Sequence, residues 1–200
     1  YIRLLKGACM NIENMKIISI DDNKTNLLII ESYAKILKLN ISSFLNPLDA
    51  VDELEKNDYD LIIVDYMMPE MNGIEVIQKV RETNQTIPII MLTAVGDDME
   101  LQIKALEVGA NDFLNKPINA PAFKARIINM LKLRKAQLLI ENKALLLEDE
   151  VKKATLRLKE SEHEALQMLG KASEYKDPET NAHTKRVSHY SKLLANAYGL

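Results

Sequence analysis

Four short apolar runs each end in a polar side chain, and this pattern restricts the fold more than any other feature of the chain. The runs are Lys16–Ile20, Leu61–Val64, Ile87–Leu92 and Asp112–Asn115, followed by Asp21-Asp22, Asp65, Thr93 and Lys116. Runs of this kind are typical of strands buried on both faces of a parallel sheet. In such a sheet the carboxyl ends of the strands share one edge, where ligands bind. The sequence therefore predicts one polar site assembled from four separated segments.

Segments with helical periodicity alternate with these runs, and a further strand is predicted at Asn40–Phe44. The predicted helices are Lys24–Leu39, Pro47–Asn57, Ile74–Glu82, Asp98–Val108 and a segment from Asn119 onward. Pro47 suits the first turn of its helix, Asp97-Asp98 can cap the fourth helix, and Gly109 can end it. Five strand–helix units predict an α/β fold with a five-stranded parallel doubly wound sheet, covered on both faces.

Composition excludes several classes of protein. A single cysteine rules out an internal disulfide framework and is typical of a reducing cytoplasm. The net charge of −3 gives no support for DNA as a partner. No apolar run approaches the roughly 20 residues that span a bilayer, so no membrane partner is expected. Residues 1–14 lack the apolar core of a signal peptide and are interpreted as a frayed leader or a cloning remnant.

The residue types at the predicted edge suit a divalent cation and a phosphoryl group. Asp21, Asp22 and Asp65 offer the hard oxygen ligands that Mg²⁺ prefers. Because crowded carboxylates repel one another, a cation or Lys116 must compensate their charge. A carboxylate can attack phosphorus to form an aspartyl phosphate, and Mg²⁺, an ammonium and the Thr93 hydroxyl would stabilise the transferring oxygens. The alternative, that these acids only cap helices, does not explain the whole set.

The same residues carry a resemblance to a known family. Residues 16 to about 135 resemble the receiver domain of two-component response regulators. The matching elements are the acidic pair Asp21-Asp22, the segment 65–73 (Asp-Tyr-Met-Met-Pro-Glu-Met-Asn-Gly), Thr93-Ala94, and Lys116-Pro117 with Phe113 three residues before the lysine. The segment fits the family's Asp-x-x-Met-Pro-x-Met-x-Gly signature.

The resemblance implies a phosphoacceptor and a metal site. Asp65 is expected to accept a phosphoryl group from the phosphohistidine of a sensor histidine kinase. The expected cofactor is Mg²⁺, bound by Asp22, Asp65 and the main-chain carbonyl of Met67, while Asp21 helps through water. Met67 and Val95 would flank the phosphoryl group, and since neither can orient a water, slow self-dephosphorylation is a hypothesis. Simple packing is the alternative role for both.

The resemblance also implies a conformational switch. Thr93 and Lys116 are expected to hold the phosphoryl oxygens. Phe113 matches the family's switch aromatic, which turns inward when the threonine hydroxyl moves. The Lys116-Pro117 peptide bond is expected to be cis, as is plausible before proline.

The chain changes character after Pro121. From Ala122 to about Ser173 there is no proline, and a heptad frame fits. One seam position holds Met130, Gln137, Ala144, Val151, Leu158, Ala165 and Ala172, and the other holds Leu133, Ile140, Leu147, Ala154, Ser161 and Met168. We interpret residues 122–173 as a coiled-coil linker that forms a parallel homodimer, after a receiver domain at 15–121 whose last helix runs to about 135. An amphipathic helix packed back on the receiver is the alternative.

Residues 169–183 are similar to the opening of an HD-GYP domain, a family of metal-dependent phosphodiesterases acting on cyclic di-GMP. Glu179 and His183 stand four apart, so one helix face carries both, and each matches a ligand position of that family. The chain has no His-Asp doublet and no Gly-Tyr-Pro, so residues 174–200 are interpreted as an N-terminal stub. No stand-alone enzyme is expected in this chain. His163 faces away from the seam and is interpreted as solvated surface rather than a phosphorelay histidine.

Three functions compete on this evidence. The first is a two-component response regulator that signals through a dimerising helix to an output domain. The second is a cyclic di-GMP phosphodiesterase of which this chain is only the regulatory fragment. The third is a flavodoxin-like cofactor binder, which is disfavoured because no glycine-rich phosphate loop follows the first strand.

Overall fold

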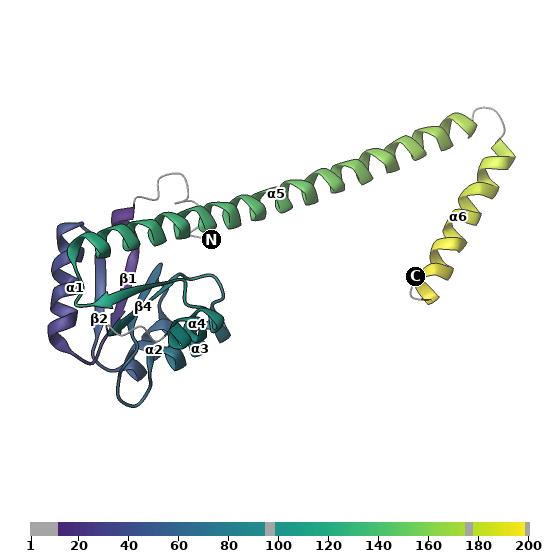
Figure 1. Ribbon diagram of the computed structural model, residues 1–200. Coiled ribbons are helices and arrows are strands. Elements are labelled where there is room, and N and C mark those ends of the chain that lie inside the picture. Colours follow the sequence, from purple (N-terminus) through teal and green to yellow (C-terminus); the bar gives the residue numbers. More distant parts are fainter. Residues whose placement is uncertain (1–11, 95–98, 175–177, 199–200) are drawn as a thin grey trace. The chain divides into compact units, whose positions relative to one another are not determined.

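The protein is described by a computed structural model that covers residues 12–94, 99–174 and 178–198. The chain forms two compact units, the first of which ends at Lys143. The elements in chain order are the 3₁₀ helix η2 (Ile12–Asn14), β1 (Lys16–Ile20), α1 (Lys24–Ile36), β2 (Asn40–Phe44), α2 (Pro47–Lys56), β3 (Leu61–Asp65), α3 (Gly73–Thr83), β4 (Ile89–Ala94), α4 (Met99–Glu107), β5 (Asp112–Lys116), α5 (Ala120–Glu174) and α6 (Pro178–Tyr198) (Figure 1).

The first unit contains the predicted parallel sheet. Its five strands run in the order β2-β1-β3-β4-β5, and every neighbouring pair is parallel. The register places Ile20 beside Val64 and Val64 beside Met91, so the carboxyl ends of β1, β3 and β4 lie at one edge. The chain reverses its direction of travel across the sheet after β2, which puts the switch point of the topology next to β1 and β3.

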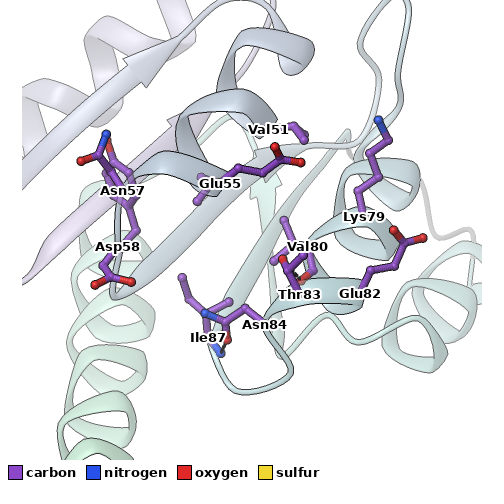
Figure 2. Close-up of a pocket in the computed structure, with 12 residues that line it drawn as sticks. Val51, Glu55, Asn57, Asp58, Lys79, Val80, Glu82, Thr83, Asn84 and Ile87 are labelled. Carbon is purple, nitrogen blue, oxygen red and sulfur yellow. Dashed lines mark hydrogen bonds between the residues drawn. The ribbon is translucent and has the colours of Figure 1, made fainter.

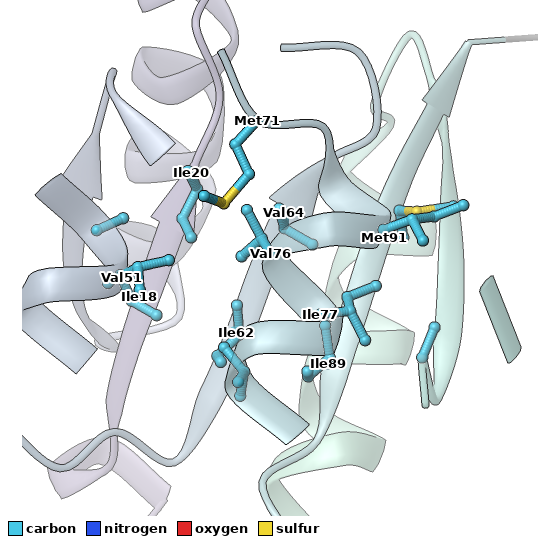
Figure 3. Packing of buried hydrophobic residues seen from close by; sticks show 14 of the residues in the cluster. Ile18, Ile20, Val51, Ile62, Val64, Met71, Val76, Ile77, Ile89 and Met91 are labelled. Carbon is cyan, nitrogen blue, oxygen red and sulfur yellow. The ribbon is translucent and has the colours of Figure 1, made fainter. Parts of the chain in front are cut away.

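Helices cover both faces of the sheet, which confirms the doubly wound fold. On one face α2, α3 and α4 bury a cluster that includes Ile18, Ile62, Val76, Ile77 and Ile89 (Figure 3). On the other face α1 and α5 bury a second cluster, which includes Ile17, Ile30, Leu61, Ile63, Ile90, Phe123, Ile127 and Leu131. The strands need apolar residues at nearly every position because both of their faces are covered.

Most predicted element boundaries agree with the structure within two residues. Three strands extend further than predicted, because Asp65, Thr93 and Lys116 lie within β3, β4 and β5 rather than after them. Helix α1 stops at Ile36 instead of Leu39, and Lys38 takes a positive φ of 57° after its end. Gly109 follows α4 with a φ of 111°, a conformation that favours glycine. The predicted cap Asp97-Asp98 lies outside the described residues.

Asparagine caps begin three of the helices that surround the site. The side chains of Asn23, Asn46 and Asn72 accept hydrogen bonds from main-chain N–H groups in the first turns of α1, α2 and α3. At α3 the cap is reciprocal, since Glu75 accepts from the main-chain N–H of Asn72 at 2.8 Å. Such caps stabilise a helix start by about 1 kcal/mol each, and they set the points from which the loops of the site begin.

Helix α5 packs on the sheet of the first unit over its first turns and is solvent-exposed beyond them. Phe123, Ile127 and Leu131 are fully buried, and Leu138 is the last apolar side chain that contacts the core. Arg134 is buried as well and donates to the Thr86 hydroxyl at 3.0 Å, which joins the helix to the loop between α3 and β4. In the second unit the described side chains of α5 are exposed. In the described ranges no helix has the length and apolar character needed to cross a membrane.

Candidate functional site

Three carboxylates gather at the carboxyl edge of the sheet. Asp21 and Asp22 follow β1, and Asp65 is the last residue of β3, the neighbouring strand. One carboxylate oxygen from each lies within 4.8 Å of the others. Asp21 and Asp65 are buried, whereas Asp22 is exposed, so the cluster is open to solvent on one side. The structure thus brings together the three acids that the sequence singles out.

Lys116 reaches this cluster from the end of β5. Its Nζ atom lies 2.7 Å from Asp65 Oδ1 and 2.9 Å from Asp21 Oδ2, so one ammonium bridges two buried carboxylates. Lys116 lies two strands from Asp65 in the sheet, and only the parallel arrangement carries its side chain to the same edge. The Lys116-Pro117 bond that follows is cis, as expected.

Burial and the neighbouring charges shift the pKa values of this pair. Burial raises the pKa of Asp65, Lys116 opposes the shift, and the charge of Asp21 adds to it, so the net shift is upward. Burial by itself lowers the pKa of Lys116, but its hydrogen bonds to Asp65 and Asp21 and their charges outweigh that effect and raise it. The ammonium is therefore firmly protonated, and the ionised form of Asp65 is disfavoured by burial and by the charge of Asp21, which a bound cation would offset.

Asp21 is held in place by residues that sequence reasoning missed. The side-chain amide of Asn26 donates to both Asp21 oxygens at 3.0 Å, and the main-chain N–H of Asn23 donates to Oδ1 at 2.9 Å. Asn26 lies in the first turn of α1, which starts directly after the acidic pair. That position, five residues beyond Asp21 at a helix start, is the signal that could have identified it.

Thr93 and Phe113 lie on neighbouring strands, and a second missed residue links Thr93 to β5. The Thr93 hydroxyl donates to Asn115 Oδ1 at 3.1 Å, across the β4–β5 pair in which these two residues are partners. In the same strand pair Phe113 lies beside Met91, which precedes Thr93 by two residues. The Phe113 side chain is half-buried against the core on the sheet face that α2, α3 and α4 cover. The hydroxyl therefore already has an acceptor for its single proton. Thr93 lies near the carboxyl end of β4, at the same edge of the sheet as the acids.

The loop after β3 depends on close backbone contacts. A Cβ atom on Gly73 would lie 2.4 Å from the Asp65 carbonyl oxygen, and the Gly73 N–H donates to the Tyr66 carbonyl at 2.9 Å. Glu70 adopts a positive φ of 68° within the same loop. Met67 is exposed there, whereas Val95, its predicted companion beside the phosphoryl group, lies outside the described residues. The slow self-dephosphorylation argued from this pair stays a prediction.

The donor set fits a small hard cation. Mg²⁺ binds carboxylate and carbonyl oxygens at about 2.0–2.1 Å and keeps several waters, so opposite ligands lie about 4 Å apart. The three carboxylate oxygens lie within 4.8 Å of one another, and the exposed side at Asp22 leaves room for waters. No histidine or cysteine joins the cluster among the described residues, which excludes the ligands that Zn²⁺ prefers.

A separate hollow lies away from these acids. It has a volume of about 180 Å³ and lies between α2 and α3, near the amino ends of β3 and β4. Figure 2 shows Glu55 of α2 and Lys79 and Glu82 of α3 among its lining residues. None of the residues predicted to form the site lines it.

The second predicted metal pair is found on one helix. Glu179 and His183 both belong to α6, where His183 is exposed and the side chain of Glu179 lies outside the described residues. His163 is exposed on α5, which agrees with its interpretation as solvated surface.

Fold and site together define the class to which the chain belongs. A five-stranded parallel sheet that collects acids, a hydroxyl and a lysine at its carboxyl edge is the arrangement of a signalling receiver. The sequence profile of the response regulator receiver domain matches residues 17–128, more than half of the chain. The chain belongs to the response regulator receiver family, as its resemblance suggested.

Individual relatives extend the comparison. The chain is 38% identical over 174 residues to "Cyclic di-GMP phosphodiesterase response regulator RpfG" of Xanthomonas campestris pv. campestris, covering 86% of this chain and 45% of the relative. It is 31% identical over 193 residues to "Cyclic di-GMP phosphodiesterase" of Thermotoga maritima, covering 93% and 52%. The chain thus spans about half the length of these relatives. The receiver domain of Francisella response regulator 1452 superimposes with a TM-score of 0.56 at 28% identity, covering 60% of this chain and 98% of that one.

Proposed function

We propose that this chain accepts a phosphoryl group on Asp65 from a sensor histidine kinase, in a reaction that depends on Mg²⁺. The observation that carries the proposal is the single ammonium of Lys116, which lies within 3 Å of both Asp65 and Asp21 beside a third carboxylate. Such a site gives a phosphoryl group a nucleophile, a cation position and a fixed positive charge at one place.

The chemistry assigns a step to each side chain. An Asp65 carboxylate oxygen forms a bond to phosphorus while the bond from phosphorus to the donor's histidine nitrogen breaks, and that nitrogen keeps the bonding electrons and takes a proton from solvent. Asp22, Asp65 and the Met67 carbonyl would hold the Mg²⁺, with Asp21 acting through water. The cation supplies charge neutralisation for the incoming phosphoryl oxygens. Lys116 then turns its hydrogen bond from the carboxylate to a phosphoryl oxygen.

The hydroxyl of Thr93 is the proposed switch. It has one proton to donate, and in this structure it donates to Asn115. A phosphoryl group on Asp65 offers a stronger, charged acceptor, so the hydroxyl would leave Asn115. The β4 and β5 ends would then repack around Phe113, which is half-buried against the core.

The test is phosphorylation of the purified chain. Incubation with acetyl phosphate and Mg²⁺ should add one phosphoryl mass, as measured by intact mass spectrometry. Asp65→Asn should add none, and Asp52→Asn, which removes an exposed acid on α2, should behave as the native chain does. Absence of an adduct in the native chain, or an adduct that persists in Asp65→Asn, would contradict the proposal.

The helix that follows is proposed to carry the signal. We assign residues 15–121 to the receiver, with α5 packing on it to about 135, residues 122–173 to a linker that forms a homodimer, and residues 174–200 to the start of an output domain. Support comes from the exposed apolar side chains along α5 and from the relatives, whose similarity extends well past the receiver profile.

The second candidate function concerns that output. We infer that the chain is the regulatory fragment of an HD-GYP cyclic di-GMP phosphodiesterase, because two relatives with that activity in their names match 86% and 93% of it. Glu179 and His183 would then be two ligands of a metal site completed by residues outside this chain. The longer protein should hydrolyse cyclic di-GMP at a rate that Asp65 phosphorylation changes, and this chain alone should not. Hydrolysis by the 200-residue chain itself would contradict this assignment.

A further inference from the structure

Helix α5 presents two different faces in the first unit. Leu131 is fully buried against the sheet, whereas Leu133 is 44% exposed and Ile140 is 68% exposed. Successive helical residues are 100° apart, so Leu133 lies about 200° around the axis from Leu131 and Ile140 lies close to Leu133. The helix therefore holds the receiver with one side while a second, apolar side remains without a partner among the described residues.

The second apolar side continues through the second unit at heptad spacing. Val151 is 64% exposed and Leu158 is 69% exposed, at the seam position that follows from Met130, and Leu147 and Met168 are exposed at the other seam position. Seam residues that repeat every 3.5 positions need a supercoiled partner helix to bury them. We name this stripe, from Ile140 to Met168, the α5 seam.

Charged residues flank the α5 seam in an ordered way. The e positions come directly after the second seam residue of each heptad and hold Glu141, Glu148, Thr155 and Glu162. The g positions come directly before the first seam residue and hold Ala136, Lys143, Glu150, Arg157 and Glu164. In a parallel in-register dimer each g residue faces the e residue five positions later in the partner. Lys143 then faces the partner's Glu148, and Arg157 faces the partner's Glu162.

Within the α5 seam no like-charged pair arises in that register. The remaining g residues are Ala136, Glu150 and Glu164, and they face Glu141, Thr155 and Leu169 of the partner subunit, so none of these contacts joins two charges. The twofold symmetry of the dimer repeats each attractive pair, which gives the interface four of them. Opposite charges at these positions set the orientation and the partner of a coiled coil.

Other arrangements place acids against acids. A shift by one heptad puts Glu150 opposite Glu148 of the partner subunit on one side and opposite the partner's Glu162 on the other. An antiparallel pair puts e positions against e positions, where three of the four residues are Glu. Like charges that face each other at these positions destabilise the pair.

We propose that a second copy of this chain pairs with the α5 seam in parallel and in register, with Lys143–Glu148 and Arg157–Glu162 as the pairs that select this arrangement. The inference rests on the proposed parallel dimerisation of α5 and adds its register and the charge pairs that select it. It also places the two receivers of the dimer at the same end of the paired helices.

A cysteine at the α5 seam reports the register directly. Ser161→Cys, in a chain with Cys9→Ser, places two sulfurs at the same height in the proposed dimer, within reach of a disulfide. A one-heptad shift separates them by about 10 Å along the axis, too far for a bond. His163→Cys is the matched control, because that exposed residue points away from the seam. We expect mild oxidation to cross-link Ser161→Cys and to leave His163→Cys uncross-linked.

Charge reversal tests the selecting pairs. Lys143→Glu should weaken the dimer about tenfold, because two attractive pairs become two repulsive ones. Adding Glu148→Lys should restore the affinity. Lys159→Glu makes the same charge change at an exposed position outside the seam and its e and g positions, and should leave the affinity within about twofold. Analytical ultracentrifugation of the 200-residue chain, with and without acetyl phosphate and Mg²⁺, measures all four proteins.

The outcomes separate this inference from the proposed function. A chain that dimerises but does not cross-link through Ser161→Cys, or that ignores Lys143→Glu, overturns the register while the dimerising helix stands. A chain that stays monomeric in both phosphorylation states overturns the dimerising helix itself. Phosphorylation of Asp65 is measured independently of either result.

Discussion

Single residues decide how charge is balanced at the site. Asp21, Asp22 and Asp65 bring three carboxylates within 4.8 Å of one another, and Lys116 supplies one ammonium to two of them. Two negative charges therefore remain uncompensated when all four groups are ionised. A divalent cation matches that deficit. Burial is the main cause of the raised pKa of Asp65, and the charge of Asp21 adds to it.

The raised pKa of Asp65 leads to a prediction about stability and pH. Because the folded chain binds the Asp65 proton more tightly than the unfolded chain, this group stabilises the fold fully below its ordinary pKa of 3.8 and loses that contribution as pH rises through the folded value. Without metal at pH 7 the ionised carboxylate is a net cost. Asp65→Asn in EDTA should raise the free energy of unfolding by roughly 1 kcal/mol.

The measurement is urea denaturation of both proteins between pH 4 and pH 8. The gain from Asp65→Asn should shrink as pH falls toward about 4, because the carboxyl of the folded native chain takes up its proton. Saturating Mg²⁺ should stabilise the native chain more than the variant, because the variant lacks a ligand. A gain that grows at acidic pH would show that the sign of the argument is wrong.

Gly73 yields a second prediction at the same scale. A Cβ atom there would lie 2.4 Å from the Asp65 carbonyl oxygen, so Gly73→Ala must displace the backbone that carries the phosphoacceptor. We expect a loss of roughly 2–3 kcal/mol in stability and a slower reaction with acetyl phosphate. Gly170→Ala is the control, since a Cβ there meets nothing within 4 Å and alanine favours a helix by about 1 kcal/mol. Equal effects of the two substitutions would refute the steric argument.

At the scale of elements, α5 matters most because it belongs to the receiver and to the linker at once. Its first turns bury Phe123, Ile127 and Leu131 in the core beneath the sheet. Arg134 then extends the contact to the loop between α3 and β4 through the Thr86 hydroxyl. Helix α5 is thus held to the sheet by apolar contacts in its first turns and by the Arg134 hydrogen bond further along. A conformational change in the receiver can therefore be passed on through a rigid helix.

The Thr86 contact predicts how firmly α5 is attached. Thr86→Val removes the acceptor of a buried guanidinium N–H without changing the side-chain volume much, and it should cost about 1–2 kcal/mol. Amide hydrogen exchange should rise in residues 130–138 of α5. Thr155→Val removes a hydroxyl that bonds only within the exposed helix and should cost less than about 0.5 kcal/mol. Unchanged exchange in Thr86→Val would mean that apolar contacts alone hold the helix.

At the scale of the whole molecule, the chain divides where α5 leaves the receiver. The first compact unit ends at Lys143 and contains the whole sheet, both clusters of core residues and the site. A chain ending at Lys143 should therefore fold, and it should accept a phosphoryl group on Asp65 within about twofold of the native rate. It should also be monomeric, because most of the α5 seam is gone. Sizing and intact mass measurements check both results, and a stable dimer of the shortened chain would move the interface to the receiver.

The linear pattern of residues determined the fold class and most of the site. Apolar runs that end in acids, a hydroxyl and a lysine report strands buried on two faces, and the parallel sheet then brings Asp21, Asp65 and Lys116 to one edge. These signals are local in the sequence, and they can be recognised because characteristic residue types occur at strand ends and helix starts. Strand ends still shifted by up to two residues, since apolar periodicity does not mark where a ladder of hydrogen bonds stops.

Only the tertiary structure decided which partners those residues have. Asn26 holds Asp21, Asn115 takes the Thr93 proton, and Arg134 reaches Thr86, and each contact joins side chains whose meeting depends on the packing of elements. An asparagine or an arginine looks the same in the sequence whether it faces solvent or a neighbouring strand. The sequence specifies which chemistry is present, and folding specifies which groups are close enough to use it, because hydrogen bonds act over about 3 Å.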